Sequence, residues 1–227
     1  MQTQVWFEGT PSLDIVKRIS NAHLVYYPNY VVEENIANVV SERPKDRINL
    51  CYFGRVTPEK NVDVVIKAFD MLCKKYDDVF LTIIGGTGFS KEYVKDIDAM
   101  IDNSPYRSHI VRKGLTPFAE IKEIMQSQHF FVFPSKERCE GHSNSLNEAM
   151  AQGLVPIVSD YHFNRAIVGD DRMIVDGYDP QAYADKIIQI RENYDLKKLS
   201  IEMRDRVKTA FSYNVVNKRI YEELKKI

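Results

Sequence analysis

The chain has 227 residues, of which 44% are hydrophobic, and its formal net charge is −1. This length suits one domain of ordinary size, or one domain plus a fragment. The charge balance gives no broadly basic surface, so a nucleic-acid partner is not expected.

The sequence also lacks the patterns of membrane, secreted, disulfide-rich and zinc-binding proteins. No stretch approaches the roughly 20 apolar residues that cross a bilayer, and the N-terminus lacks the basic start and long apolar core of a signal peptide. The three cysteines show no CxxC spacing, which argues against a disulfide framework or a zinc site. We therefore expect a cytoplasmic protein without a metal site.

The first 47 residues are predicted to hold only two elements. A helix is expected over 5–20 and a short strand over 24–27, which ends at Pro28 and Asn29. The polar segment 33–46 has the character of a linker. Two elements cannot form a second domain, so the main fold is expected further along the chain.

From residue 48 onward, strand-like and helix-like segments alternate. The helical segments carry apolar residues three or four positions apart, whereas the strand-like segments are short and rich in β-branched residues. Such alternation implies βαβ units, and hence an α/β, Rossmann-like fold whose parallel sheet is covered by helices on both faces. We predict strands over 48–53, 79–84, 109–113, 129–133, 155–159 and 172–175, and helices over 62–76, 91–101, 117–126 (with Thr116 as N-cap), 144–151, 180–193, 196–211 and 215–226.

The first candidate site follows the strand 48–53. Ligands of parallel α/β sheets bind beyond the carboxyl ends of the strands. Here Gly54 ends the strand, Arg55 follows it, and Lys60 lies near the start of the next helix. Two cations and several free amides could neutralise a diphosphate. The alternative is an ordinary turn whose charges are solvated.

Glycines also follow the next two strands. Gly85 and Gly86 follow 79–84, and Gly114 precedes Leu115 after 109–113. Glycine permits close backbone approach and positive φ. The pattern is not GxGxxG, so it does not indicate a dinucleotide fingerprint. Simple strand-to-helix turns are the alternative at both places.

The segment 140–148 is the most informative part of the chain. It places Glu140 in a loop and Glu148 eight positions later inside a helix, with small and polar residues at the helix start. Helix N-terminal amides attract anions. Two carboxylates on either side of such a site could bind the hydroxyls that a nucleotide sugar carries on both sides of its diphosphate. Taken alone, each glutamate could instead be a solvated surface residue.

These segments together resemble the donor-binding domain of retaining glycosyltransferases of the GT-B fold, glycosyltransferase family 4 in particular. The family's common form EGFGxPxxEAMAxG corresponds to EGHSNSLNEAMAQG at 140–153, and its GR-x-x-x-x-KN segment corresponds to 54–61. His142 and Ser143 replace the usual Phe-Gly, so the sugar specificity of better-known members does not carry over.

The resemblance implies a role for each candidate residue. Arg55 and Lys60 would bind the donor phosphates, Glu140 the sugar hydroxyls and Glu148 the ribose, while backbone amides at the helix start would hold the distal phosphate. No metal or other cofactor is expected, because these cations and amides would stabilise the leaving diphosphate. The candidate catalytic residues are Arg55, Lys60 and Glu140, and the donor-binding candidates are Gly54, Gly85, Gly86, Leu115, Ser143, Asn144, Ser145, Leu146 and Glu148.

The resemblance also implies a domain organisation. A GT-B enzyme places its active site between two Rossmann-like domains. Residues 1–23 look like the end of an N-terminal acceptor domain, 24–47 like a first strand and linker, and 48–227 like the nucleotide-sugar-binding domain. The chain would then need the missing acceptor domain for activity, and that domain would supply any peripheral membrane association.

The implied function is transfer of a sugar from a UDP- or GDP-sugar to a glycan or lipid-linked acceptor, by a hexosyltransferase that retains the anomeric configuration. Three alternatives stay open. They are a nucleotide-sugar epimerase of GT-B fold, a phosphorylase of related fold, for whose pyridoxal-phosphate lysine the sequence gives no pointer, and a non-catalytic nucleotide-binding module.

Overall fold

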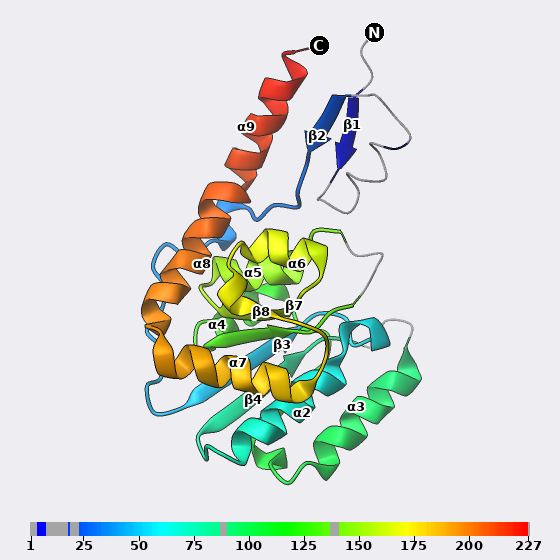
Figure 1. Ribbon diagram of the computed structural model, residues 1–227, viewed down its shortest axis with the longest axis vertical. Coiled ribbons are helices and arrows are strands. Elements are labelled where there is room, and N and C mark those ends of the chain that lie inside the picture. Colours follow the sequence, from blue (N-terminus) through cyan, green and yellow to red (C-terminus); the bar gives the residue numbers. More distant parts are fainter. Residues whose placement is uncertain (1–3, 8–17, 19–22, 87–89, 137–140, 227) are drawn as a thin grey trace.

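The structure is a computed structural model that describes residues 4–7, 18, 23–86, 90–136 and 141–226. Its centre is a six-stranded sheet in the order β5-β4-β3-β6-β7-β8, and every neighbouring pair in it is parallel (Figure 1). This confirms the predicted Rossmann-like α/β fold. The strands are β3 (Ile48–Phe53), β4 (Val79–Ile84), β5 (Ile110–Lys113), β6 (Phe130–Phe133), β7 (Val155–Ser159) and β8 (Ile174–Val175).

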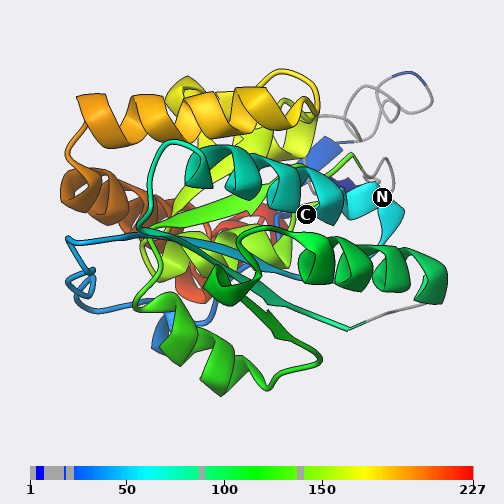
Figure 2. The ribbon, with the colours of Figure 1, turned by 90° about the horizontal axis from the view of Figure 1, so that it is seen from below.

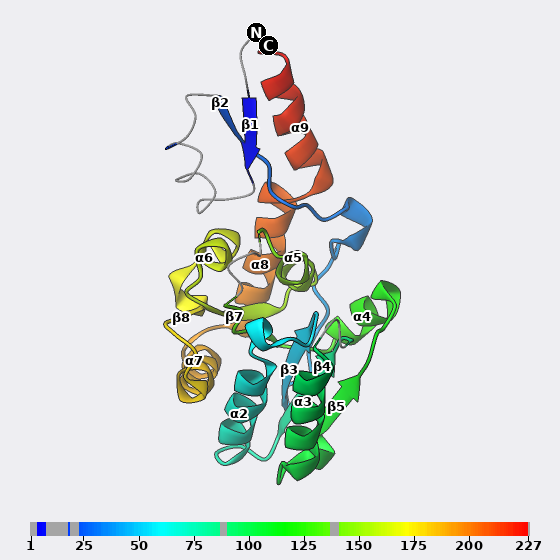
Figure 3. The same ribbon diagram turned by 90° about the vertical axis from the view of Figure 1, so that its right-hand side faces the viewer.

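Helices cover both faces of the sheet. On one face α2, α3 and α7 lie side by side, and α5, α6 and α8 lie on the other (Figures 2 and 3). All residues of β3, β6 and β7 are therefore buried, as expected of strands covered on both sides. The helices are α2 (Val62–Cys73), α3 (Lys91–Asn103), α4 (Phe118–Met125), α5 (Asn144–Ala151), α6 (His162–Val168), α7 (Pro180–Asn193), α8 (Leu196–Ala210) and α9 (Tyr213–Leu224).

The strands are added first on one side of β3 and then on the other. The chain runs outward from β3 through β4 to β5, and then returns to β6 on the other side of β3. Leu50 and Cys51 of β3 pair with Phe130 and Phe131 of β6. In open α/β sheets, ligands bind in the crevice outside the carboxyl ends of the strands at such a point. The fold therefore places a crevice between the loops that follow β3 and β6.

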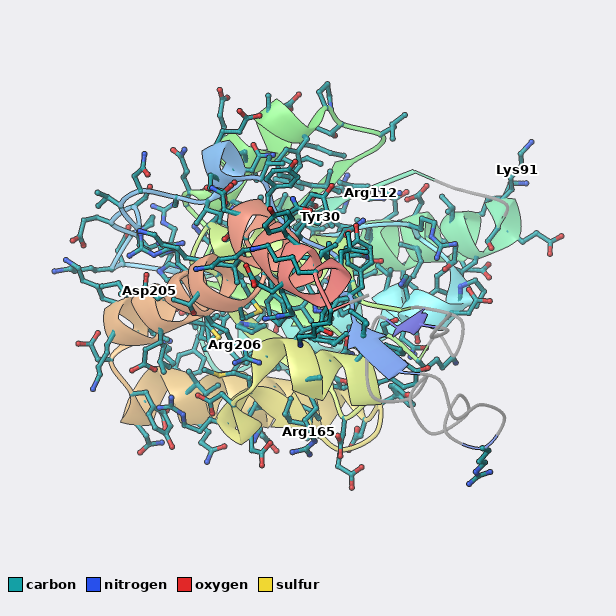
Figure 4. All side chains as sticks on the ribbon, turned by 90° about the horizontal axis from the view of Figure 1, so that it is seen from above. Tyr30, Lys91, Arg112, Arg165, Asp205 and Arg206 are labelled. Carbon is teal, nitrogen blue, oxygen red and sulfur yellow. The ribbon has the colours of Figure 1, made fainter. Side chains whose placement is uncertain are left out.

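The N-terminal segment forms a separate two-stranded parallel ladder. In it β1 (Gln4–Phe7) pairs with β2 (His23–Tyr26), and this ladder lies beside α9, away from α3 (Figures 1 and 3). The ring of Tyr26 lies 5.5 Å from the guanidinium of Arg219, which holds β2 against α9. Tyr30, which follows β2, packs edge-to-face on Tyr213, the first residue of α9 (Figure 4).

Two local predictions are wrong, and one helix was missed. Residues 5–7 form a strand and not a helix, because Val5, Trp6 and Phe7 pair with β2; apart from Arg18, the rest of 8–20 lies outside the described residues. Thr116 does not cap α4, since its hydroxyl donates to Gly114 and Pro117 holds the cap position. The short helix α6 was not predicted.

The remaining helices agree with the prediction to within a few residues at their ends. Among the helices that the structure describes, none combines the length and the apolar character needed to cross a membrane.

Candidate functional site

A pocket of about 340 Å³ opens at the crevice between the loops after β3 and β6. Two segments far apart in sequence form most of its wall: the loop that follows β3 and the segment that leads into α5. Six predicted site residues therefore lie together. The lining residues are Asn29, Gly54, Arg55, Lys60, Gly141, His142, Ser143, Asn144 and Ser145.

The end of β3 is shaped by two glycines. Gly54 has φ +146°, and Gly85, at the end of the neighbouring β4, has φ +148°. A Cβ on Gly85 would lie 1.8 Å from the carbonyl oxygen of Gly54, so this close approach requires glycine. The Tyr52 hydroxyl donates to the carbonyl of Arg55 at 2.5 Å and fixes the start of the loop. The Arg55 side chain is exposed along the pocket.

Lys60 is only 3% exposed, although it carries a charge. Its Nζ lies 3.5 Å from the hydroxyl oxygen of Ser135 and 5.2 Å from the ring centroid of Phe133. The next residue, Asn61, has φ +49° and donates to the carbonyl of Pro134 at 2.8 Å. The loops after β3 and β6 are therefore joined, and this joint holds a buried ammonium group at the wall of the pocket.

The N-terminus of α5 faces the same pocket. Ser143 is its N-cap, and its hydroxyl accepts from the amide of Leu146 at 3.4 Å and lies 3.2 Å from the hydroxyl of Ser145. Leu146 itself is fully buried in the core, so only its backbone belongs to this site. The first amides of a helix attract anions, and here the start of α5 lines the same pocket as the cations of the β3 loop.

Glu148 lies one turn into α5, four positions after Asn144 and so on the same face of the helix. Burial raises the pKa of its carboxyl group to about 7, and among the described residues it makes no hydrogen bond or ion pair. Glu148 does not line the pocket. A partly buried carboxylate of this kind is stabilised by hydroxyl donors, which is the role predicted for it.

His142 and Asn29 also line the pocket, although neither was predicted as a site residue. Asn29 donates to the carbonyl of His142 at 2.5 Å, and the side-chain amide of Asn147 contacts His142 Nδ1 at 2.9 Å. Burial, with a smaller effect of Arg206, lowers the pKa of His142 to about 3, so the ring is neutral. The one feature of the sequence that could have indicated Asn29 as a site residue is its place in a Pro-Asn turn.

The other predicted residues lie near the pocket or outside the described part of the chain. Gly85, Gly86 and Leu115 do not line it. Gly86 and Leu115 are neighbours, since a Cβ on Gly86 would lie 3.9 Å from the Cβ of Leu115. Leu115 is 93% exposed, so its side chain makes little contact with the protein. Arg112 donates to the carbonyl of Gly85 at 2.9 Å and fixes this loop (Figure 4). Glu140 lies outside the described residues.

Comparison with known proteins gives the family. A model of the family described as "Glycosyl transferases group 1" matches residues 32–210 of this chain. A curated relative from Methanocaldococcus jannaschii, described as an uncharacterized glycosyltransferase, is 27% identical over 198 residues. The match covers 83% of this chain but only 46% of the relative, so the chain spans about half of that protein.

Solved structures share the fold. A glycosyltransferase from Rickettsia africae superposes with a TM-score of 0.85 at 17% identity, over 99% of this chain and 63% of that one. Anabaena HepE, whose crystal structure is in complex with UDP and glucose, superposes with a TM-score of 0.80 at 16% identity, with the same two coverages. At these identities the likeness concerns the fold alone.

Proposed function

Because the chain belongs to the group 1 family of glycosyl transferases, we propose that it is the donor-binding half of an enzyme that transfers a sugar from a UDP- or GDP-sugar. The pocket at the β3/β6 crevice carries this proposal. It combines two cations, Arg55 and Lys60, with the N-terminus of α5. That set of groups suits a diphosphate, which bears negative charge on several oxygens. The UDP in the structure of HepE, a protein of the same fold, supports the choice of ligand.

In this proposal, the same groups serve binding and catalysis. As the bond between the sugar and the diphosphate breaks, negative charge grows on the departing phosphate. Arg55, Lys60 and the first amides of α5 stabilise that charge, because they are held in place before the reaction begins. Glu148 accepts hydrogen bonds from the ribose, and Glu140 from the donor sugar. The sugar is transferred with retention of configuration and without a metal ion.

Transfer itself requires a second domain in this proposal. The chain spans 46% of the M. jannaschii relative, which leaves room in such proteins for an acceptor-binding half. We propose that residues 1–23 belong to that half, that 24–47 link the two, and that 48–227 bind the nucleotide sugar. The acceptor is a glycan or a lipid-linked glycan, and the acceptor-binding half supplies any contact with a membrane.

The proposal is tested by calorimetric titration of UDP, GDP and the matching nucleosides into the 227-residue chain. Changing Arg55 or Lys60 to Met should weaken diphosphate binding by about 1.5–3 kcal/mol, the usual range for hydrogen bonds to charged groups. The nucleosides should bind wild type and variants alike, because they carry no phosphate.

Lys67→Met is the matched control, because Lys67 is an exposed cation paired with Asp63 on α2, away from the pocket. It should leave all affinities unchanged. Unchanged diphosphate affinity in both pocket variants would contradict the proposed function, as would equal losses in the control.

A further inference from the structure

A second cavity, of about 570 Å³, lies at the opposite end of the sheet from the pocket described above. It is bounded by the segment 40–48, by the amino ends of β3 and β6, by the end of α7 and by the start of α8. The six residues of β3 separate the two sites by roughly 20 Å, at about 3.3 Å per residue. Cavities of this size are typical of small-molecule sites.

The wall of this cavity is rich in positive charge. Of its fifteen lining residues, five are Lys or Arg and two are acidic. Apolar groups lie beside these charges, among them Val40, Ile48 and Leu196. The combination suits a ligand with an apolar body and an anionic group. The five cations are Arg43, Lys45, Arg47, Arg191 and Lys197.

Some of these charged groups already have partners within the protein. Arg43 donates to the carbonyls of Ser41, Gln128 and Gln152, at 2.6, 2.6 and 2.8 Å, so its guanidinium is occupied. Lys197 pairs with Glu42 at the rim. The ring nitrogens of His129 are likewise engaged, by the amide of Asn49 and the carbonyl of Pro44.

Arg191 is engaged as well. Its Nη2 donates to Asp78 at 3.2 Å, and its guanidinium lies 4.7 Å from the ring centroid of Tyr76. Its Nη1 has almost no accessible surface, so it cannot be reached from the cavity. Lys45 adds an exposed ammonium at the rim.

We infer that this cavity binds a small organic anion with an apolar body, whose anionic group contacts Lys45 and Lys197 at the rim. The inference does not depend on the proposed function, since the cavity is remote from the β3/β6 crevice. The site shares β3 and β6 with that crevice but no lining residue, so a ligand here and a nucleotide can be bound together.

The test uses 8-anilinonaphthalene-1-sulfonate as the anionic probe and N-phenyl-1-naphthylamine as its neutral counterpart without the sulfonate. Fluorescence titration should show one site for the anionic probe, at least tenfold weaker binding of the neutral one, and no displacement by UDP. Equal binding of the two probes, or displacement of the anionic probe by UDP, would overturn the inference.

Removing a positive or a negative charge from the rim should change the affinity for the anionic probe in opposite directions. Lys197→Gln should weaken binding of the anionic probe about three- to fivefold, as the loss of one exposed charge contact allows. Glu42→Gln removes a carboxylate from the same wall and should strengthen it by a similar factor. Lys198→Gln is the matched control, because Lys198 is the exposed neighbour of Lys197 on α8 but does not line the cavity.

Filling the cavity gives an independent readout. Ser41→Trp should abolish probe binding while leaving the affinity for UDP unchanged. If the charge variants and the control change probe binding alike, or if the Ser41→Trp chain folds and still binds the probe, the inference is wrong.

Discussion

At the amino end of the sheet, Arg43 is half-buried and donates to three backbone carbonyls, whereas at the carboxyl end the buried Lys60 lies 3.5 Å from the hydroxyl of Ser135. Both are cations removed from water. Burial, the larger effect, lowers the pKa of Arg43 to about 10, and its hydrogen bonds join the segment 41–43 to the residues before β6 and after α5. Arg43 therefore acts as a structural cross-link, while Lys60 borders an open pocket.

Two histidines show the same contrast. His129, at the amino end of β6, has both ring nitrogens in hydrogen bonds with the backbone, at 3.1 Å to the amide of Asn49 and 2.9 Å to the carbonyl of Pro44. His142, at the carboxyl end, contacts Asn147 through Nδ1, but its Nε2 is buried without a partner among the described residues. We therefore expect stability to depend on side chains at the amino end, and nucleotide affinity on groups at the carboxyl end.

The largest expected effect on stability lies at the carboxyl end and comes from the backbone, not from a side chain. Gly85→Ala should destabilise the fold by more than about 4 kcal/mol, since its Cβ would overlap the carbonyl of Gly54 at 1.8 Å. Gly86→Ala is the control: the nearest atom to its Cβ is 3.9 Å away, so the cost should stay below about 1 kcal/mol. Urea denaturation measures both, and equal midpoints would refute the argument.

The next effect concerns the cross-link at the amino end. Arg43→Met should destabilise the protein by about 3 kcal/mol, because three carbonyls lose a charged donor. Arg47→Met, which removes an exposed guanidinium paired with Asp46, should cost less than about 1 kcal/mol. The folded Arg43 variant should still bind UDP as wild type does. A parallel loss of UDP affinity would show that the two ends are not separable.

A smaller effect is the dependence of stability on pH that His129 produces. Burial, with minor effects of Arg43 and Arg191 and despite the opposing hydrogen bond to Pro44, lowers its pKa from 6.5 to about 4. The unfolded chain therefore binds this proton first, and stability is lost as the pH falls from about 6.5 toward 4. Between pH 7 and pH 5 this loss amounts to about 2 kcal/mol for one such group.

The test compares His129→Gln with wild type by urea denaturation at pH 7 and at pH 5. The variant should lose about 2 kcal/mol less than wild type over this interval, whatever the contribution of the other titrating groups. Identical pH dependence in the two proteins would mean that His129 is not held neutral by the fold.

The smallest effect separates the two glutamates of the donor motif. Glu148→Ala should weaken UDP and the UDP-sugar alike by about 0.5–1.5 kcal/mol, because both ligands contain the ribose. Glu140→Ala should weaken the sugar nucleotide only. Calorimetry with both ligands on both variants, after a check that each unfolds cooperatively, distinguishes the roles. If the two substitutions act alike on both ligands, the assignment of roles fails.

The periodic parts of this fold could be predicted from the sequence, and the non-local parts could not. The bounds of β3 and α5 were predicted as observed, because apolar spacing and flanking glycines act locally. Residues 5–7 were misassigned because their strand is specified by pairing with β2, about twenty residues away. The helix α6 has only seven residues and no side-chain cap, so it gave no recognisable pattern.

The two sites likewise differ in how far the sequence predicts them. The carboxyl-end pocket could be predicted because its residues lie in two compact motifs, each following a strand. That these motifs meet, and that Asn29 lines the same pocket, depends on the strand order, which sequence patterns do not encode. The cations of the amino-end cavity lie between positions 43 and 197 without a motif, so only the structure brings them together.

Hydrogen–deuterium exchange with and without UDP measures whether the nucleotide binds at the carboxyl end of the sheet. We expect slower amide exchange in residues 54–61 and 141–148, and no change in 40–48 or 191–200. Protection at the amino end instead, or saturating UDP binding without protection of either carboxyl-end segment, would contradict this expectation.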